Sequence, residues 1–284
     1  MDLNKPYLTI PHPRIPIEIR EISEDEFNQI KQDSETIYRA YYYLRRLRII
    51  EQNRDAYFSI KAYYTQLLQE NYEKPIEYDF KAEAFLDLNR CLINYVSSFK
   101  ALVEHCEKKV AETFGKDSLQ FASFKGMLST LYDNNINYRL LYNLRNFSVH
   151  KDFPIEWVNY DRIRFSDDEY WYEIGVFFSK EKFQGSRTFR TKMGRFLDEL
   201  EPKTQVCPFL NGLIPLLKEV IREFISIIKP EFFDAMERIQ SLSKNNRRNE
   251  LSITRPAMVT GHRIDYNSVL IPIHIANNLH ELTQ

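Results

Sequence analysis

The stretch from Tyr142 to Lys151 carries an arginine, an asparagine and a histidine at spacings suited to phosphate chemistry. On a helix, Asn146 and His150 share a face, and Arg145 can reach toward the same point. A neutral imidazole can take the proton of a ribose 2′-hydroxyl, while a guanidinium holds the phosphate and stabilises developing charge. Arg145 and His150 are therefore candidate catalytic residues for RNA cleavage without a metal. Asn146 is expected to position the phosphate or to orient the histidine.

The same residues also fit a structural role. A histidine at the end of a helix is favoured by the helix dipole, and an arginine on a helix commonly forms a surface ion pair. An Arg and a His separated by four residues arise by chance about 0.4 times in a chain of this composition. The spacing of Arg145 and His150 alone is therefore weak support for catalysis. The choice between the catalytic and the structural role depends on the helices that position these residues.

The composition indicates a globular helical protein. The chain has 284 residues, of which 43% are apolar and 28% charged, so it can bury a sizeable core. Only seven glycines accompany 18 tyrosines and 20 phenylalanines, which favours long helices with aromatic packing, and no glycine-rich nucleotide loop is present. The net charge of −1 means that any binding to nucleic acid must use a local basic patch.

The sequence predicts neither a metal site nor a cofactor site. Three cysteines lie far apart without a paired motif, which favours free thiols in a reducing compartment. His105 with Glu104 and Glu107 lacks a third converging ligand. The N-terminus shows no signal peptide and no apolar run reaches membrane-spanning length, so we expect a cytoplasmic protein without membrane contact.

Apolar periodicity and capping signals predict four long helices. Ser23 resembles the start of a capping box, Gly115 ends the second helix, Ser118 caps the third, and Pro230 divides the fourth. Within the third helix, residues 133–135 mark an irregularity. The expected helices run from Ser23 to about Glu73, from about Phe80 to Phe114, from Ser118 to near Lys151, and from Pro208 to about Leu242.

The remaining segments read as extended structure. Four prolines and alternating isoleucines make residues 1–22 an extended arm. The alternating side-chain pattern of residues 156–183 predicts a β-hairpin inserted between helices, with its turn at 166–169. Residues 244–284 read as a linker and an extended segment, in which Val269 to Ile275 suggests a short strand that pairs with the hairpin or the arm. The fold class is thus mainly α, a helical bundle over residues 23–243 with an inserted hairpin and short extended termini.

Two groups of basic residues are candidates for RNA contact. Arg45, Arg46 and Arg48 lie between groups of tyrosines on the first helix, a mixture that can bind phosphates and stack on bases. The alternative is an amphipathic helix whose tyrosines pack with their hydroxyls at the rim. Arg187 and Arg190 precede a short helix and form either a substrate-guiding patch or an ordinary basic loop.

The segment Leu144-Arg145-Asn146-Phe147-Ser148-Val149-His150 resembles the motif of the HEPN superfamily (higher eukaryotes and prokaryotes nucleotide-binding), in which a polar residue follows the arginine and a histidine comes a few residues later. The helix at Leu88–Tyr95 and the segment Phe153–Ile155 resemble uncharacterised bacterial members. The resemblance covers about residues 24–154 and 209–243, whereas the hairpin and both extended termini depart from the minimal bundle.

This resemblance implies an all-α bundle that dimerises so that two motifs face one cleft. It also implies a metal-independent endoribonuclease of a toxin–antitoxin or phage-defence system, with RNA as substrate and an antitoxin protein as a further partner. By the resemblance, Arg145 and His150 are catalytic and Asn146 supports them. Because some members bind nucleotides, RNA or proteins without cleaving, a non-catalytic binding bundle is the alternative.

Overall fold

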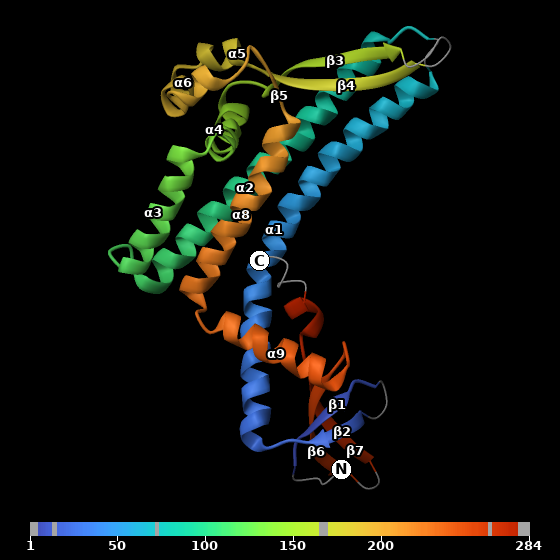
Figure 1. The fold of residues 1–284 in the computed structure, drawn as a ribbon, viewed down its shortest axis with the longest axis vertical. Helices are drawn as coiled ribbons and strands as arrows, with labels where there is room; N and C mark the ends of the chain where they lie inside the picture. Colours follow the sequence, from blue (N-terminus) through green and yellow to red (C-terminus); the bar gives the residue numbers. More distant parts are fainter. Residues whose placement is uncertain (1–4, 13–15, 72–73, 165–169, 261–262, 278–284) are drawn as a thin grey trace. The chain divides into compact units, whose positions relative to one another are not determined.

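The computed structural model describes residues 5–12, 16–71, 74–164, 170–260 and 263–277. The chain is mainly helical with two small antiparallel sheets (Figure 1), which confirms the predicted fold class at that level. It divides into two compact units, which we call the central unit (residues 46–220) and the terminal unit (residues 1–45 and 221–284). Among the described residues, no helix combines the length and apolar character that crossing a membrane requires.

The two units do not coincide with the segments 1–22, 23–243 and 244–284 that the sequence suggested. The division falls inside two helices, at Arg45 and at Val220. Helices α1 (Glu24–Glu70) and α8 (Cys207–Ile228) each continue through both units. Because residues 24–45 belong to the same unit as the C-terminal residues, the boundary cannot be read from linker composition.

The central unit is a helical assembly with an aromatic core. Its largest fully buried side chains include Tyr57, Tyr95 and Phe99. The Tyr95 hydroxyl donates a hydrogen bond of 2.8 Å to the carbonyl of Leu210, which ties the second helix to α8. Gly115, at φ 88°, ends that helix as predicted. The helices that lie wholly in this unit are α2 (Tyr78–Phe114), α3 (Leu119–Asn134), α4 (Ile136–His150), α5 (Lys180–Gly185), α6 (Arg187–Met193) and α7 (Phe196–Glu199).

The single helix expected from Ser118 to near Lys151 is two helices, α3 and α4, which corrects that prediction. Ser118 caps α3 as predicted, since its hydroxyl accepts a hydrogen bond from the Phe121 amide. Asn135 has an extended backbone, at φ −127° and ψ 116°, and its side chain accepts from the Tyr138 amide to start α4. The expected irregularity is therefore a complete break, and the Arg145 motif lies on a fourth helix.

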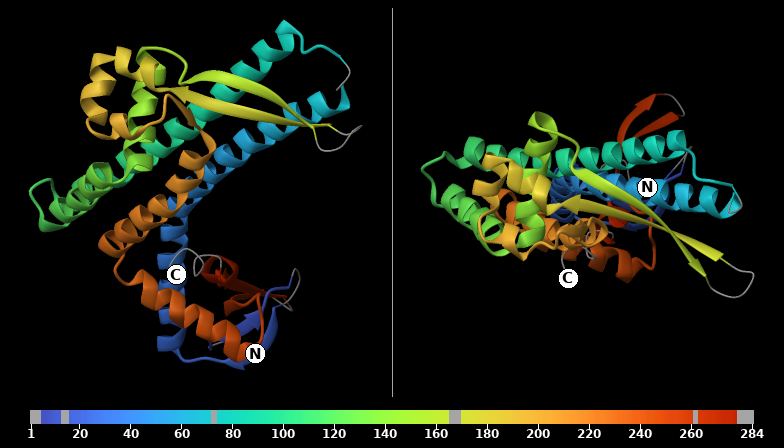
Figure 2. Two further views of the ribbon diagram at one scale, coloured as in Figure 1. Left: turned by 45° about the horizontal axis from the view of Figure 1, so that its top comes forward. Right: turned by 90° about the horizontal axis from the view of Figure 1, so that it is seen from above.

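The predicted hairpin is present in the central unit as strands β3 (Ile155–Arg164) and β4 (Tyr170–Ser179), extended by β5 (Lys203–Gln205) in the order β3-β4-β5. Its predicted turn lies outside the described residues. Tyr160 donates to the Lys81 carbonyl, and the Tyr172 amide donates to Gln69. The hairpin therefore lies along the C-terminal end of α1 and the N-terminal end of α2 (Figure 2).

The terminal unit contains the second sheet, in the order β2-β1-β6-β7. The predicted N-terminal arm thus forms strands, and it pairs with the C-terminal segment and not with the hairpin. Residues 273–275, the end of the predicted strand, are helical, in a helix that runs from residue 273 to residue 277. Pro272 explains the difference, because proline fits the first turn of a helix and interrupts a strand ladder. The strands are β1 (Tyr7–Ile10), β2 (Ile17–Glu21), β6 (Ser252–Thr260) and β7 (Arg263–Leu270).

Capping and one ion pair to a buried carboxylate fix the helices of the terminal unit. Ser23 accepts a hydrogen bond from the Glu26 amide at 3.1 Å, which confirms the predicted helix start. Helix α9 (Phe232–Asn246) begins after Pro230, as predicted. Its Arg238 binds both carboxylate oxygens of Asp33, which is 4% exposed, at 2.7 and 2.8 Å.

Candidate functional site

Helix α4 presents one face to the core and one face to solvent. Leu144 and Phe147 are buried, and the Phe147 ring lies 5.3 Å from Phe183 on α5 and 5.5 Å from Phe189 on α6. These contacts fix the rotation of α4 about its axis. Arg145 and Asn146 are half-buried and His150 is exposed, so the sequence-predicted site lies on the accessible face of the helix.

Two cations converge on the oxygen of Asn146. The Arg145 guanidinium donates a hydrogen bond to Oδ1 at 3.3 Å, and the Lys100 ammonium donates to the same atom at 2.8 Å. We call these three residues the Asn146 cluster. Its amide oxygen occupies a position where two positive charges meet one acceptor, and arginine and lysine are the side chains that commonly bind phosphate oxygens.

Lys100 is held in this position by its surroundings on α2 and α4. Its side chain is only 11% exposed, with the ammonium 3.6 Å from the Glu104 carboxylate and 5.1 Å from the centre of the Tyr142 ring. In the described part of the chain, the polar partners of the ammonium are therefore one carboxylate, that of Glu104 in an ion pair, and one neutral acceptor, the Asn146 oxygen. Sequence reasoning missed Lys100, because it lies 46 residues before Asn146 and nothing in its own segment marks it.

His150 is accessible and is the last residue of α4. It forms no hydrogen bond or ion pair with any residue that the structure describes. Asn146 shares its helix face one turn earlier, but the Asn146 oxygen is bound by the two cations. Of the two roles considered for Asn146, contact with the cations Arg145 and Lys100 therefore fits the geometry better than orientation of the histidine by that oxygen.

The chain that follows His150 is firmly anchored. Lys182 on α5 binds Asp152 at 2.9 Å and Glu156 at 2.6 Å. Hydrogen bonds from Lys182 and from the Phe153 amide hold the pKa of Asp152 below its ordinary value. The buried Asn89 of α2 accepts from the Ile155 amide at 3.1 Å. The segment that joins α4 to the hairpin is thus held by α5 through Lys182 and by α2 through Asn89. His150 directly precedes this segment and stays exposed.

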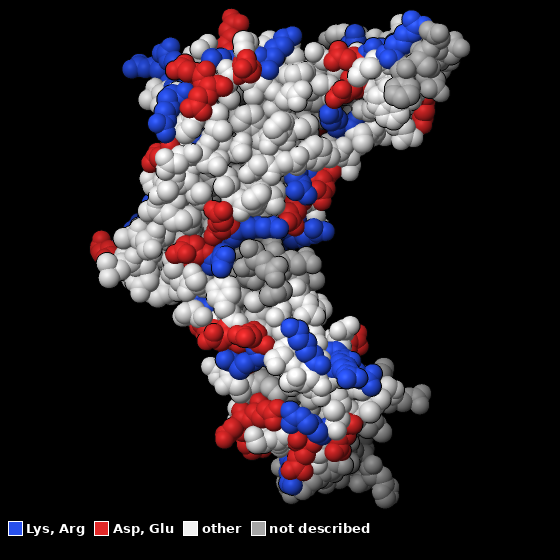
Figure 3. Space-filling model, in the orientation of Figure 1, with Lys and Arg blue, Asp and Glu red and all other residues white. Residues whose placement is uncertain are grey.

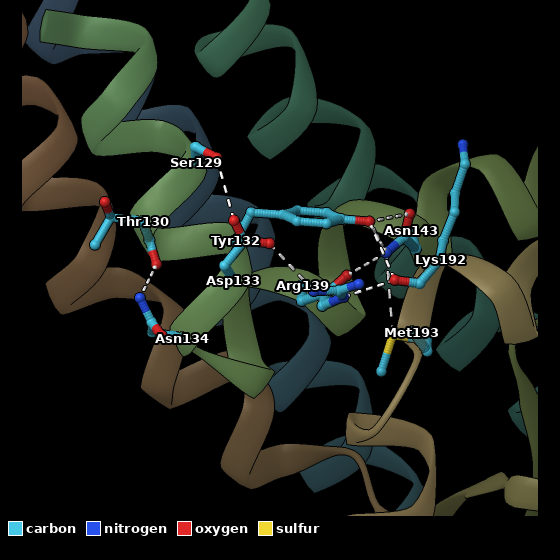
Figure 4. A network of polar contacts seen from close by, with 9 residues as sticks. All are labelled: Ser129, Thr130, Tyr132, Asp133, Asn134, Arg139, Asn143, Lys192 and Met193. Carbon is cyan, nitrogen blue, oxygen red and sulfur yellow. Dashed lines mark hydrogen bonds and ion pairs between the residues drawn. The ribbon is translucent and has the colours of Figure 1, made fainter.

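A polar network joins α3, α4 and α6 beside the site (Figure 4). The Arg139 guanidinium donates to the Lys192 carbonyl at 2.6 Å and lies 4.5 Å from the centre of the Tyr132 ring. The buried Asn143 donates to the Tyr132 hydroxyl at 2.9 Å. These residues bind one another, and the Tyr132 ring also lies 5.7 Å from the Tyr142 ring, which neighbours Lys100, so the network holds α4 in place next to the Asn146 cluster.

The candidate arginines of the first helix lie on either side of the division between the two units. Arg45 belongs to the terminal unit and lies 6.0 Å from the Tyr41 ring, while Arg46 and Arg48 belong to the central unit. Arg48 pairs with Glu51 at 3.2 Å. Several of the interleaved tyrosines pack inward, including Tyr57 and Tyr64, which supports the packing interpretation for these positions.

Arg187 and Arg190 are exposed on α6, which is held against α4 through Phe189. Neither guanidinium forms a hydrogen bond or ion pair with a described residue. Figure 3 shows Lys and Arg side chains over α5 and α6 with Asp and Glu side chains among them. This face therefore offers single cations to a ligand and not an unbroken basic patch.

No group of three or more His, Cys, Asp or Glu side chains in the described residues is arranged to hold a metal ion. Ser148 donates its hydroxyl to the carbonyls of Leu144 and Arg145, as a helix serine commonly does. Comparison of the chain with family models, with curated proteins and with solved structures finds no match. The function must therefore be argued from the site itself.

Proposed function

We propose that this chain is a metal-independent endoribonuclease in which the Asn146 cluster binds the scissile phosphate and His150 transfers protons. The observation that supports this most directly is the meeting of Arg145 and Lys100 at a single oxygen, 3.3 and 2.8 Å away. The exposed imidazole lies one helical turn beyond. The proposal also draws on the resemblance of the Arg145–His150 segment to the HEPN motif.

The proposed reaction uses the neighbouring 2′-hydroxyl of the RNA. His150 accepts the 2′-hydroxyl proton, and the oxygen attacks phosphorus while Arg145 and Lys100 stabilise the added negative charge. The bond to the 5′-oxygen breaks, and that oxygen takes a proton from an imidazolium. The products are a 2′,3′-cyclic phosphate and a 5′-hydroxyl, and no metal or cofactor takes part.

This reaction needs a base and an acid at the same time, whereas the motif supplies one histidine per chain. A homodimer that brings the two His150 side chains to one cleft would provide both groups. The exposed Val149 and Phe153 beside His150, at 52% and 41% exposure, are apolar surface that such an interface would cover. Action as a cytoplasmic toxin or phage-defence effector with an antitoxin partner belongs to the same proposal and rests on the HEPN resemblance.

The test is cleavage of single-stranded RNA by the full chain in the presence of a chelator. We expect His150→Ala and Arg145→Ala each to lower the rate about 100-fold or more, and Lys100→Ala to lower it as well. His274→Ala removes an exposed histidine of the terminal unit and serves as the matched control. Cleavage that continues unchanged in His150→Ala would contradict the proposal.

A second candidate is a non-catalytic bundle that binds a nucleotide, RNA or a protein partner, with Arg145 as phosphate anchor. The observation in its favour is that no described residue orients the His150 imidazole. Tight RNA binding without turnover, weakened by Arg145→Ala but not by His150→Ala, would identify this function.

A further inference from the structure

A cavity of about 600 Å³ lies between α2, α3 and α4 in the central unit. This volume is within the range of small-molecule sites and suits a nucleotide. The lining mixes carboxylates, ammonium groups and two aromatic rings. Its residues are Glu104, Glu107, Lys108, Ala111, Glu112, Lys116, Phe121, Lys125 and Tyr142.

The cavity begins where the Asn146 cluster ends. The Lys100 ammonium lies 3.6 Å from Glu104 and 5.1 Å from the Tyr142 ring, and both of these residues line the cavity. Tyr142 also lies three residues before Arg145, so the two side chains are neighbours on α4. A phosphate bound by Lys100 and Arg145 would therefore place an attached nucleoside at the mouth of the cavity.

Two carboxylates, those of Glu104 and Glu107, line the cavity together with Tyr142. Burial, and then the charges of these two carboxylates, raise the pKa of the Tyr142 hydroxyl. Phe121, in the first turn of α3, is half-buried and stacks on no other ring within the described residues. The cavity thus offers a free aromatic ring together with acceptors for hydrogen bonds.

The lysines that pair with the carboxylates of the lining can be replaced there by the donors of a ligand. Lys125 binds Glu107 at 3.0 Å and Lys108 binds Glu112 at 3.7 Å, with the side chains partly or largely exposed. Exposed pairs of this kind contribute little to stability. A ligand that brings its own donors can replace the lysines on the carboxylates without a large cost to the fold.

We propose that this cavity binds the nucleobase next to the phosphate held by the Asn146 cluster, and that it prefers guanine. Bases of single-stranded RNA are recognised by stacking on aromatic rings and by hydrogen bonds along the Watson–Crick edge. Guanine presents two adjacent donors there, N1–H and the N2 amino group, which match the two oxygens of one carboxylate. The other bases present a single donor group at that edge. The phosphate part of this assignment depends on the proposed function.

The test measures binding, not cleavage, of guanosine, adenosine, cytidine and uridine monophosphates to the full chain, with 3′- and 5′-phosphates compared. We expect the wild type to bind at least one guanosine monophosphate about tenfold or more tightly than its adenosine counterpart. The double variant Glu104→Gln/Glu107→Gln should bring this ratio close to one, and Phe121→Ala should weaken all four. Glu83→Gln, an exposed position on α2 away from the cavity, is the matched control.

Removing a carboxylate near Lys100 can change the affinity for every phosphate-bearing nucleotide. The ratio of the affinities for two nucleotides cancels such a general change. Equal affinity for all four nucleotides, no binding, or a ratio unchanged in the double variant would overturn the proposal. A guanine preference in a protein that does not cut RNA would support the cavity and contradict the endoribonuclease. Cleavage of RNA without any guanine preference in binding would support the endoribonuclease and contradict the assignment of the cavity.

Discussion

At the scale of residues, the site depends on how two cations share one neutral acceptor. A carboxylate between Arg145 and Lys100 would neutralise them, whereas the amide of Asn146 accepts their hydrogen bonds without adding a negative charge. Among the described residues, the carboxylate in an ion pair with the cluster is that of Glu104, 3.6 Å from the Lys100 ammonium, which offsets part of the lysine charge. Lys100 is largely buried, so solvent screens its charge less than that of a surface lysine. The pair can therefore attract a phosphate more strongly than the net charge of −1 suggests.

Changing Asn146 to Asp tests this electrostatic argument directly. The new carboxylate should pair with Lys100 and Arg145, so thermal stability should be retained while repulsion weakens the affinity for single-stranded RNA about tenfold or more. Fluorescence anisotropy with a labelled oligonucleotide measures the affinity, and thermal unfolding measures the stability. Asn94→Asp adds the same charge on an exposed position of α2 and is the control. Equal affinity in Asn146→Asp and wild type would mean that the cluster does not contact phosphate.

His105 predicts a pH dependence of stability. Burial, followed by the nearby charge of Arg46, lowers its pKa in the folded chain. Since the unfolded chain then binds more protons below about pH 6.5, the free energy of unfolding should fall as pH drops through that value toward the folded pKa. Urea unfolding at several pH values should show a shallower fall in His105→Gln than in the wild type. Parallel curves for both proteins would contradict the assignment.

At the scale of elements, the position of the Arg145–His150 motif depends on where α4 begins. Asn135 ends α3 through its amide, which donates to Leu131, and starts α4 through its side chain. Helix α4 has only 15 residues. Its N-terminal cap and its packing against Phe183 and Phe189 therefore together determine which of its side chains face solvent.

We therefore expect Asn135→Ala to lower the free energy of unfolding by about 1 kcal/mol, as loss of an N-cap does. Asn135→Ser keeps an acceptor at the cap and should recover most of this loss. Chemical denaturation followed by circular dichroism gives both values. Equal stability of the Ala and Ser variants would show that the side-chain cap contributes nothing.

The helix termini could be predicted where local chemistry sets them. Ser23, Ser118 and Gly115 act as the sequence suggests, because a cap depends on residues within one turn. The break at Asn135 was visible only as an irregularity, since the apolar pattern resumes directly after it. Pro272 was the overlooked signal against a strand at residues 273–275.

The site could be predicted only in part, for a physical reason. Arg145, Asn146 and His150 lie within two turns of one helix, so their spacing in the sequence already places them near one another on α4, where the structure joins Arg145 to Asn146 and leaves His150 bonded to neither. Lys100, Glu104 and Phe121 join them through packing of α2 and α3 against α4, and no local pattern reports such contacts. The proposed second His150 belongs to another chain, which the sequence of one chain does not position.

At the scale of the whole molecule, the charge distribution limits the kind of RNA contact. With 39 basic and 40 acidic residues, the chain has no general attraction for nucleic acid, and binding must come from a few local cations. For single strands, each neutralised phosphate changes the salt dependence by about 0.7 in the logarithmic slope, so a small slope is expected. The proposed site lies entirely within the central unit, and the terminal unit contributes none of its residues.

The most direct test of the proposed chemistry is the identity of the new RNA ends formed in excess chelator. Mass spectrometry of an oligonucleotide treated with the wild type should find a 2′,3′-cyclic phosphate and a 5′-hydroxyl, and a 2′-deoxy substitution at the cut nucleotide should abolish that cut. His150→Ala should give neither product. Cleavage that leaves a 5′-phosphate, that survives the 2′-deoxy substitution, or that continues in His150→Ala would contradict the mechanism.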